Sequence, residues 1–152
     1  MSFCTVVNCM DGRVQLPVIR YLKKQFGALY VDTVTEPGPS RVLAEGDDRG
    51  AVESILRRVR ISLEKHGSRQ IAVVAHEDCA GNPTDKRTQV QHLRAAAGFL
   101  RDAFPGTAVR ALWVNLDGDI QEPEASSGRV RERPYETVAA GRITEWTAPG
   151  RS

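Results

Sequence analysis

The pattern that most constrains the fold is an alternation of short apolar runs with longer amphipathic segments. Apolar and β-branched residues are concentrated at residues 3–9, 28–35, 70–76 and 108–116. Each run has the length and composition of a buried strand, and apolar residues recur at helical spacing between the runs. This β-α-β-α-β-α-β order predicts a single-domain α/β fold, with a mostly parallel central sheet, right-handed crossovers and helices on both faces.

Three connecting helices are predicted from their apolar faces and terminal residues. Pro17 suits the first turn of the first helix and Gly27 suits its end, and the second helix covers residues 49–67. The third is expected to begin with Asn82 as its cap and Pro83 at its first position. The expected buried faces are Val18, Ile19, Leu22 and Phe26; then Val52, Ile55, Leu56, Val59 and Leu63; and finally Val90, Leu93, Ala97, Leu100 and Phe104.

Turn signals and the C-terminal part complete the expected organisation. The segment 36–39 should stop the second strand, and "NLDGD" at residues 115–119 should begin a short hairpin. Residues 1–123 are predicted to form the α/β domain. Residues 124–152 have no clear period and are predicted to be a tail that packs on a partner subunit or is partly disordered, with Tyr135 and Trp146 as packing candidates.

Composition limits the partners and the compartment. The 152 residues suffice for one domain, and a net charge of +2 does not indicate binding to nucleic acid or to a membrane surface. No signal-peptide pattern is found, and no apolar run approaches the roughly 20 residues that cross a bilayer. We therefore expect a cytoplasmic protein with reduced cysteines, in which the three thiols serve metal binding or chemistry, not disulfides.

Reactive side chains follow the first and third predicted strands. Cys9, Asp11 and Arg13 occupy alternate positions after the first, and His76 and Cys79 follow the third in an H-x-x-C arrangement. If these strands are neighbours, the two cysteines and the histidine meet at one point. Two thiolates and one imidazole suit Zn²⁺ and leave one tetrahedral position open. Helix N-termini just beyond both segments are expected to help hold the thiolates.

The open position would give the chemistry. Zinc lowers the pKa of a bound water to about 7, which makes hydroxide available near neutral pH. Asp11 is placed to accept a hydrogen bond from that hydroxide and to orient it, while Arg13 can hold Asp11 through a bidentate pair. Without Arg13, Asp11 could become the fourth ligand and close the site.

The pairing of C-x-D-x-R after one strand with H-x-x-C after a later one resembles the β-class carbonic anhydrases. The resemblance implies a zinc enzyme that reversibly hydrates carbon dioxide to bicarbonate, with a hydroxide on the metal oriented by an Asp-Arg dyad. It implies Cys9, His76 and Cys79 as zinc ligands and Asp11 with Arg13 as the catalytic dyad. It also implies a homodimer or a higher homo-oligomer, with a pocket near the subunit boundary.

The resemblance extends from about residue 3 to 120 and has departures that mark a small, divergent member. Ala80 intervenes before Gly81, which is expected to reshape the loop beside the metal. The Arg-Asn-Ala-Gly type segment that the family carries after the second strand is replaced by residues 35–39. Glu36 in this segment is expected to bring a negative charge near the pocket. These differences affect metal binding less than the assignment of substrate.

Other interpretations remain for individual residues. Cys9 could be a buried structural cysteine, and Asp11 with Arg13 could be a surface ion pair. Cys4 lies inside a strand and is expected in the core. His66 at a helix end has a structural interpretation, and His92 is expected at the rim of the third helix. The "RRVR" run at residues 57–60 is interpreted as an exposed helix face.

Competing functions differ in how well they fit the sequence. A cysteine phosphatase needs arginine six positions after its cysteine, where this chain has Gln15, and the C-x-x-C, P-loop and G-x-G-x-x-G motifs are absent. A zinc-binding protein without turnover remains an alternative, with a structural or regulatory role. A related zinc hydrolase of carbonyl sulfide or carbon disulfide is the other.

Overall fold

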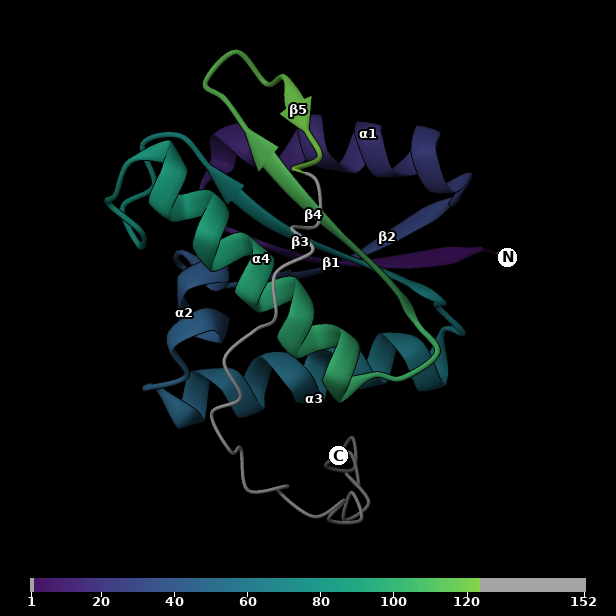
Figure 1. Cartoon of the computed structure of the whole chain (residues 1–152). Helices are drawn as coiled ribbons and strands as arrows, with labels where there is room; N and C mark the ends of the chain where they lie inside the picture. Colours follow the sequence, from purple (N-terminus) through teal and green to yellow (C-terminus); the bar gives the residue numbers. More distant parts are fainter. Residues whose placement is uncertain (1, 124–152) are drawn as a thin grey trace, which may run out of the picture.

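A five-stranded sheet organises the residues that the computed structural model describes, which are residues 2–123 (Figure 1). The strand order is β2-β1-β3-β4-β5; the first four strands run parallel, and β5 pairs antiparallel with β4. Their bounds are β1 Phe3–Asn8, β2 Tyr30–Thr35, β3 Gln70–His76, β4 Ala108–Val114 and β5 Ile120–Gln121. The predicted parallel sheet, the adjacency of the first and third strands and the hairpin after the fourth are confirmed.

Helices cover both faces of the sheet, as predicted. The helices are α1 Gln15–Phe26, preceded by the 3-10 turn η1 Gly12–Val14, then α2 Pro39–Glu45, α3 Arg49–Lys65 and α4 Lys86–Ala103. One helix, α1, packs on one face, and α2, α3 and α4 pack on the other (Figure 1). The predictions for residues 124–152, including Tyr135 and Trp146, lie outside the described residues.

Alternation along the central strands builds the two halves of the core. Val7 of β1 packs with the α2, α3 and α4 side, whereas its neighbour Val6 packs with the α1 side, because successive side chains in a strand point to opposite faces. Cys4 is 1% exposed in the α1-side core, as expected, and its burial together with the nearby Asp32 charge raises its pKa to about 11. Apolar side chains therefore pack on both faces of the sheet.

One helix boundary and one whole helix differ from the prediction. The last helix begins at Lys86, not at Asn82 and Pro83, because Asp85 caps it by accepting a 2.8 Å hydrogen bond from the Thr88 N–H. The short α2 was not predicted, since the segment 36–39 was interpreted only as a stop. Pro39 in fact occupies its first turn, a position that proline tolerates because its missing N–H has no partner there.

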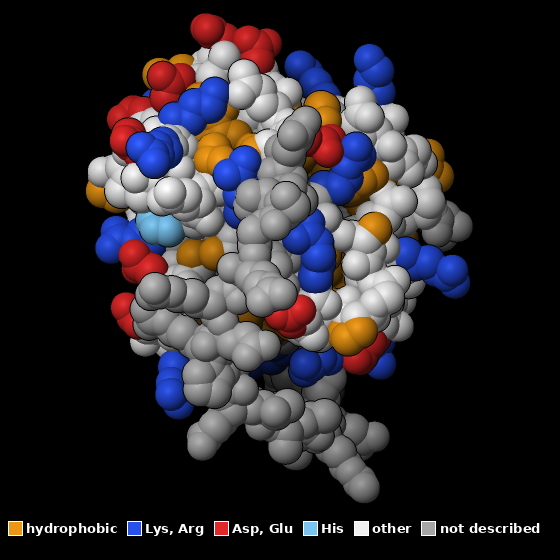
Figure 2. All heavy atoms as spheres, viewed as in Figure 1, with side chains coloured by type: hydrophobic (Ala, Val, Ile, Leu, Met, Phe, Trp, Pro, Cys, Tyr) orange, Lys and Arg blue, Asp and Glu red, His pale blue; other side chains and the backbone are white. Residues whose placement is uncertain are grey.

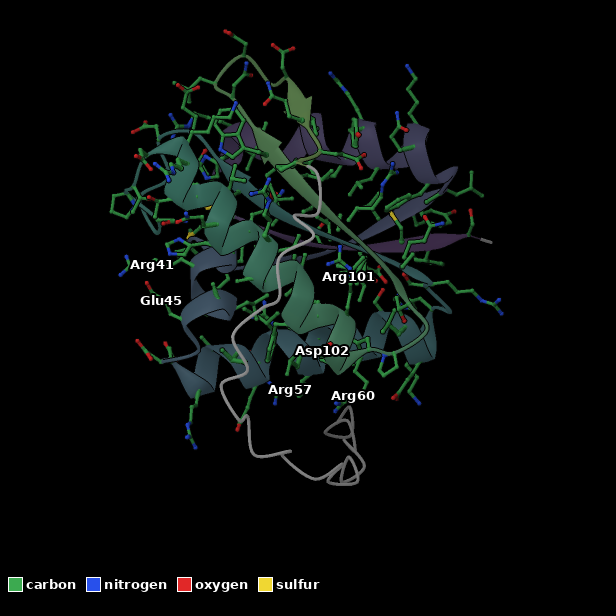
Figure 3. The ribbon with its side chains drawn as sticks, in the orientation of Figure 1. Arg41, Glu45, Arg57, Arg60, Arg101 and Asp102 are labelled. Carbon is green, nitrogen blue, oxygen red and sulfur yellow. The ribbon has the colours of Figure 1, made fainter. Side chains whose placement is uncertain are left out.

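Charges are distributed over the helices without a large area of one sign on the face shown in Figure 2. Figure 3 labels Arg41 with Glu45 on α2, which form an ion pair at 3.0 Å, and Arg57 and Arg60 on α3. The "RRVR" run is not a wholly exposed face: Arg57 is exposed, Val59 is fully buried in the core, and Arg58 pairs with Glu36 at 3.1 Å. Within residues 2–123, no helix has the length and hydropathy needed to cross a membrane.

Candidate metal centre

Cys9, His76 and Cys79 come together where β1 and β3 end. Each offers one donor atom, these atoms all lie within 4.8 Å of one another, and all three residues are buried. The two Sγ atoms are 3.8 Å apart. The convergence follows from the topology, because β1 and β3 pair in parallel and their carboxyl ends lie at the same edge of the sheet.

The donor set fits a zinc ion. The Nδ1 atom of His76 lies 2.8 Å from the Glu77 carbonyl oxygen, while its Nε2 atom is buried without a hydrogen-bond partner. A histidine that donates through one nitrogen and leaves the other free is oriented as a metal ligand. With Zn–S bonds of about 2.3 Å and tetrahedral angles, two thiolates on one zinc ion stand about 3.8 Å apart. The observed sulfur separation matches this value.

Hydrogen bonds and burial set the protonation of the two thiols. The hydrogen bond between the thiols lowers the pKa of Cys9, and contacts from His76 and from the backbone N–H groups of Gly38 and Asp11 lower it further, against the effect of burial. The same thiol contact and burial raise the pKa of Cys79. Burial opposes charge on His76, but its contacts with Cys9 and Glu77 raise its pKa overall. Cys9 is therefore the member of the pair that ionises first.

Backbone N–H groups from the segments after β1, β2 and β3 lie near the two thiols. The N–H groups of Gly81 and Asn82 lower the pKa of Cys79 against its larger upward causes. The expected helix start just after Cys79 is absent, because α4 begins only at Lys86. On the Cys9 side, Gly38 precedes α2 with φ +55 and supplies one of the donors. On the Cys79 side, loop N–H groups therefore replace the predicted helix end, whereas beyond Cys9 a helical turn begins at Gly12 with Asp11 as its cap.

Asp11 faces Arg13. Its Oδ2 accepts from Nη2 at 2.7 Å, its Oδ1 accepts from Nε at 3.0 Å, and its Oδ1 also accepts from the Arg13 backbone N–H at 2.9 Å. These hydrogen bonds from Arg13 lower the pKa of Asp11 to about 2. Asp11 is therefore ionised at neutral pH, with its carboxylate held by the guanidinium.

A pocket of about 410 Å³ opens beside this cluster. It is lined by Arg13, Asp78, Cys79, Ala80, Pro83 and Thr84. Its volume lies in the range of small-molecule sites. The pocket therefore gives a route from solvent to the segment that carries Cys79.

Glu36, which the sequence suggested as a negative charge near the pocket, is paired with Arg58 of α3. His66 lies at the end of α3, with Nδ1 2.6 Å from Asp32 Oδ2. His92 is partly buried, with Nδ1 3.2 Å from Asn82 Oδ1. Neither histidine belongs to the metal-ligating cluster found among the described residues.

Several contacts around the centre were not predicted from the sequence. Gly38 supplies an N–H to Cys9, and Asp78 contacts Arg13. Gln89 of α4 donates to the Asn82 carbonyl oxygen at 3.1 Å and accepts from Trp113 Nε1 at 2.9 Å. The only sequence signal for Gln89 is a polar residue on the otherwise apolar face of a helix.

Comparison with solved structures defines the class of fold. One matching chain comes from the crystal structures of two tetrameric β-carbonic anhydrases of the filamentous ascomycete Sordaria macrospora, with a TM-score of 0.52 and 13% identity, covering 78% of this chain and 79% of that chain. Another is the β-carbonic anhydrase CafA of the fungal pathogen Aspergillus fumigatus, with a TM-score of 0.45 and 11% identity, over 82% of this chain and 76% of that chain. The fold is that of the β-carbonic anhydrases, as predicted.

The family follows from the sequence comparison. The chain belongs to the family described as "Putative carbonic anhydrase", whose model matches residues 1–123. No curated protein matches the chain at a significant level. The predicted family is therefore confirmed, and the match covers the whole described part of the chain.

Proposed function

We propose that this protein is a zinc-dependent carbonic anhydrase that interconverts carbon dioxide and bicarbonate. One observation supports the proposal. Cys9, His76 and Cys79 bring three metal-ligating atoms together, while the Asp11 carboxylate pairs with Arg13. Three protein ligands and one position left for water are the arrangement of catalytic zinc sites, whereas four protein ligands are that of structural ones.

Each residue has a role that follows from its contacts. Cys9, Cys79 and His76 Nε2 would hold the zinc ion, and His76 Nδ1 donates to the Glu77 carbonyl oxygen to fix the ring. When bound there, zinc would supply a water molecule that ionises near pH 7. Asp11 can only accept hydrogen bonds while it is ionised, so it orients a donor in front of the metal centre. Arg13 keeps that carboxylate ionised and directed.

Stopped-flow hydration of carbon dioxide between pH 7 and 9, on protein with one zinc per chain, tests the proposal. We expect activity above buffer in the wild type, and a loss of about 100-fold or more in Asp11→Ala with its zinc content retained. Cys79→Ser should lose both zinc and activity. A fully metallated wild type with no activity across this range would contradict the enzyme proposal and favour a zinc-binding role without turnover.

A second assay distinguishes the hydrolase alternative from a carbonic anhydrase. Carbonyl sulfide and carbon disulfide are neutral linear molecules like carbon dioxide, so the same centre could attack any of the three. Hydrogen sulfide release from the sulfur compounds, measured beside carbon dioxide hydration on one preparation, ranks the substrates by kcat/KM. We expect carbon dioxide to rank first.

Assembly and compartment belong to the same proposal. The β-carbonic anhydrases of Sordaria macrospora matched in structure are described as tetrameric, and we propose a homodimer or higher homo-oligomer here. Light scattering coupled to size-exclusion chromatography measures the mass against the 16.7 kDa of one chain. A single-chain mass at micromolar concentration would contradict this. A cytoplasmic location and the division into residues 1–123 and 124–152 remain predictions.

A further inference from the structure

Arg13 is held from two sides, and only one of them is Asp11. On its second side, Nη1 donates to Asp78 Oδ2 at 3.1 Å and Nη2 donates to the Asp78 backbone oxygen at 3.1 Å. Asp11 takes the edge formed by Nε and Nη2. Asp78 directly precedes Cys79, so the guanidinium links the segment after β1 to the segment after β3 across the pocket mouth.

The backbone of Asp78 supports a specific role for this residue. Among the described residues, Asp78 is the non-glycine residue with a positive φ, at +54. Side chains other than glycine rarely adopt this conformation, although aspartate and asparagine tolerate it better than most. The conformation coincides with a backbone oxygen and a carboxylate that contact the same guanidinium. Strained positions of this kind concentrate at functional sites.

We propose that Asp78 is a positioning residue that holds Arg13 in the orientation in which it faces Asp11. Two contacts on one side of a guanidinium and a bidentate pair on the other leave it little rotational freedom. The consequence for turnover rests on the proposed function, because the reaction needs Asp11 held away from the fourth metal position. The holding itself rests only on the contacts of Asp78 with Arg13.

In this proposal the direct contacts of Asp78, not its long-range charge, hold Arg13 in place. Asp78 is 71% exposed at its side chain, so water screens its long-range field. Asp117 is a suitable control for charge, because it is also exposed and lies in the loop after β4 at the same edge of the sheet. Asp117→Asn removes one negative charge without touching Arg13.

The experiment measures Arg13 directly by NMR, in zinc-loaded protein labelled with ¹⁵N-arginine, with Arg13→Lys used to assign the signals. Guanidinium rotation, observed as exchange between the Nη signals, should become about fivefold faster in Asp78→Ala and Asp78→Gly, the factor that matches about 1 kcal/mol. Asp78→Asn, which keeps one acceptor, should lie between these variants and the wild type. Asp117→Asn should equal the wild type.

The glycine variant separates the carboxylate from the backbone. If only the positive φ mattered, Asp78→Gly would match the wild type while Asp78→Ala would differ from it, and the proposal would be overturned. Unchanged Arg13 rotation in both variants would overturn it as well. Circular dichroism and zinc content check that each variant is folded and loaded.

Measurements of carbon dioxide hydration form the second part of the experiment. In an active wild type, kcat/KM for carbon dioxide should fall about fivefold in Asp78→Gly with zinc content unchanged. Faster Arg13 rotation with unchanged kcat/KM would overturn the positioning role. If the zinc-loaded wild type is inactive, the proposed function fails, and the NMR arm still decides whether Asp78 holds Arg13.

Discussion

Gly38 and Gly81 pack backbone against backbone beside the metal centre. A Cβ on Gly38 would stand 2.5 Å from the carbonyl carbon and oxygen of Gly81, and a Cβ on Gly81 would stand 2.4 Å from the carbonyl carbon of Pro37. The loops after β2 and β3 can approach this closely only without side chains at these two positions. The contact places the N–H of Gly38 near Cys9 and that of Gly81 near Cys79.

Gly81→Ala should therefore impair both stability and metal binding. The added methyl group meets backbone atoms, which cannot move away as a flexible side chain can, so we expect a loss of about 1–3 kcal/mol in the free energy of unfolding. Denaturant unfolding and zinc content after purification measure the two effects. Gly12→Ala is the matched control, since a Cβ there meets nothing within 4 Å, and it should leave both values unchanged.

Metal removal should lower the thermal midpoint of unfolding. Residues from two chain segments would hold one ion, and any ligand that binds only the folded state stabilises it by mass action. A chelator should lower the midpoint of the wild type and of Cys4→Ala, because Cys4 is not among the three clustered donors. In Cys79→Ser the chelator should have little effect. An equal shift in all three proteins would show that the chelator acts elsewhere.

The sequence predicted those parts of the fold and site that depend on local pattern. Strand runs, the helix end at Gly27 and the convergence of Cys9 with His76 and Cys79 follow from periodicity and from the position of strand ends. These features need no knowledge of which distant backbone segments touch.

What the sequence could not provide depends on contacts between distant residues. Nothing local shows that Gly38 meets Gly81, or that Glu36 finds Arg58 across 22 positions. The start of α4 was misplaced because Asn82 and Asp85 are both good caps. In the structure Asp85 caps the helix, whereas the Asn82 side chain accepts hydrogen bonds from Thr84 and His92.

The Asp85 cap should give a measurable dependence of stability on pH. Hydrogen bonds from Thr88 lower the pKa of Asp85, so its stabilising effect is present above the ordinary aspartate pKa of about 4 and is lost as pH falls below it. Asp85→Ala should lower the denaturant midpoint at pH 7. Asp85→Asn keeps an acceptor, so it should stay near the wild type at pH 7 and lack this part of the acid dependence. Parallel acid profiles for the wild type and Asp85→Asn would contradict the expectation.

Gln89 connects the helix core to the metal loop. It is 2% exposed, its Nε2 donates to the Asn82 carbonyl oxygen, and its Oε1 accepts from Trp113 Nε1. Gln89→Met keeps the length of the side chain but leaves the buried Trp113 Nε1–H without its partner, at a cost of about 1–3 kcal/mol. The Asn82 carbonyl oxygen loses one of its two hydrogen bonds and keeps the one from the Thr84 N–H. We expect a lower free energy of unfolding and weaker zinc affinity, because the Asn82 N–H also donates to the Cys79 carbonyl oxygen at 3.1 Å.

Gln91→Met is the matched control on the same helix, since Gln91 is exposed, and it should leave both quantities unchanged. Zinc affinity is measured by competition with a chromophoric chelator, and unfolding by denaturant titration. If Gln89→Met lowers stability but leaves zinc affinity equal to that of Gln91→Met, the hydrogen bonds of Gln89 support the fold alone. A loss of both places Gln89 among the residues that hold the Cys79 loop in the geometry of the metal centre.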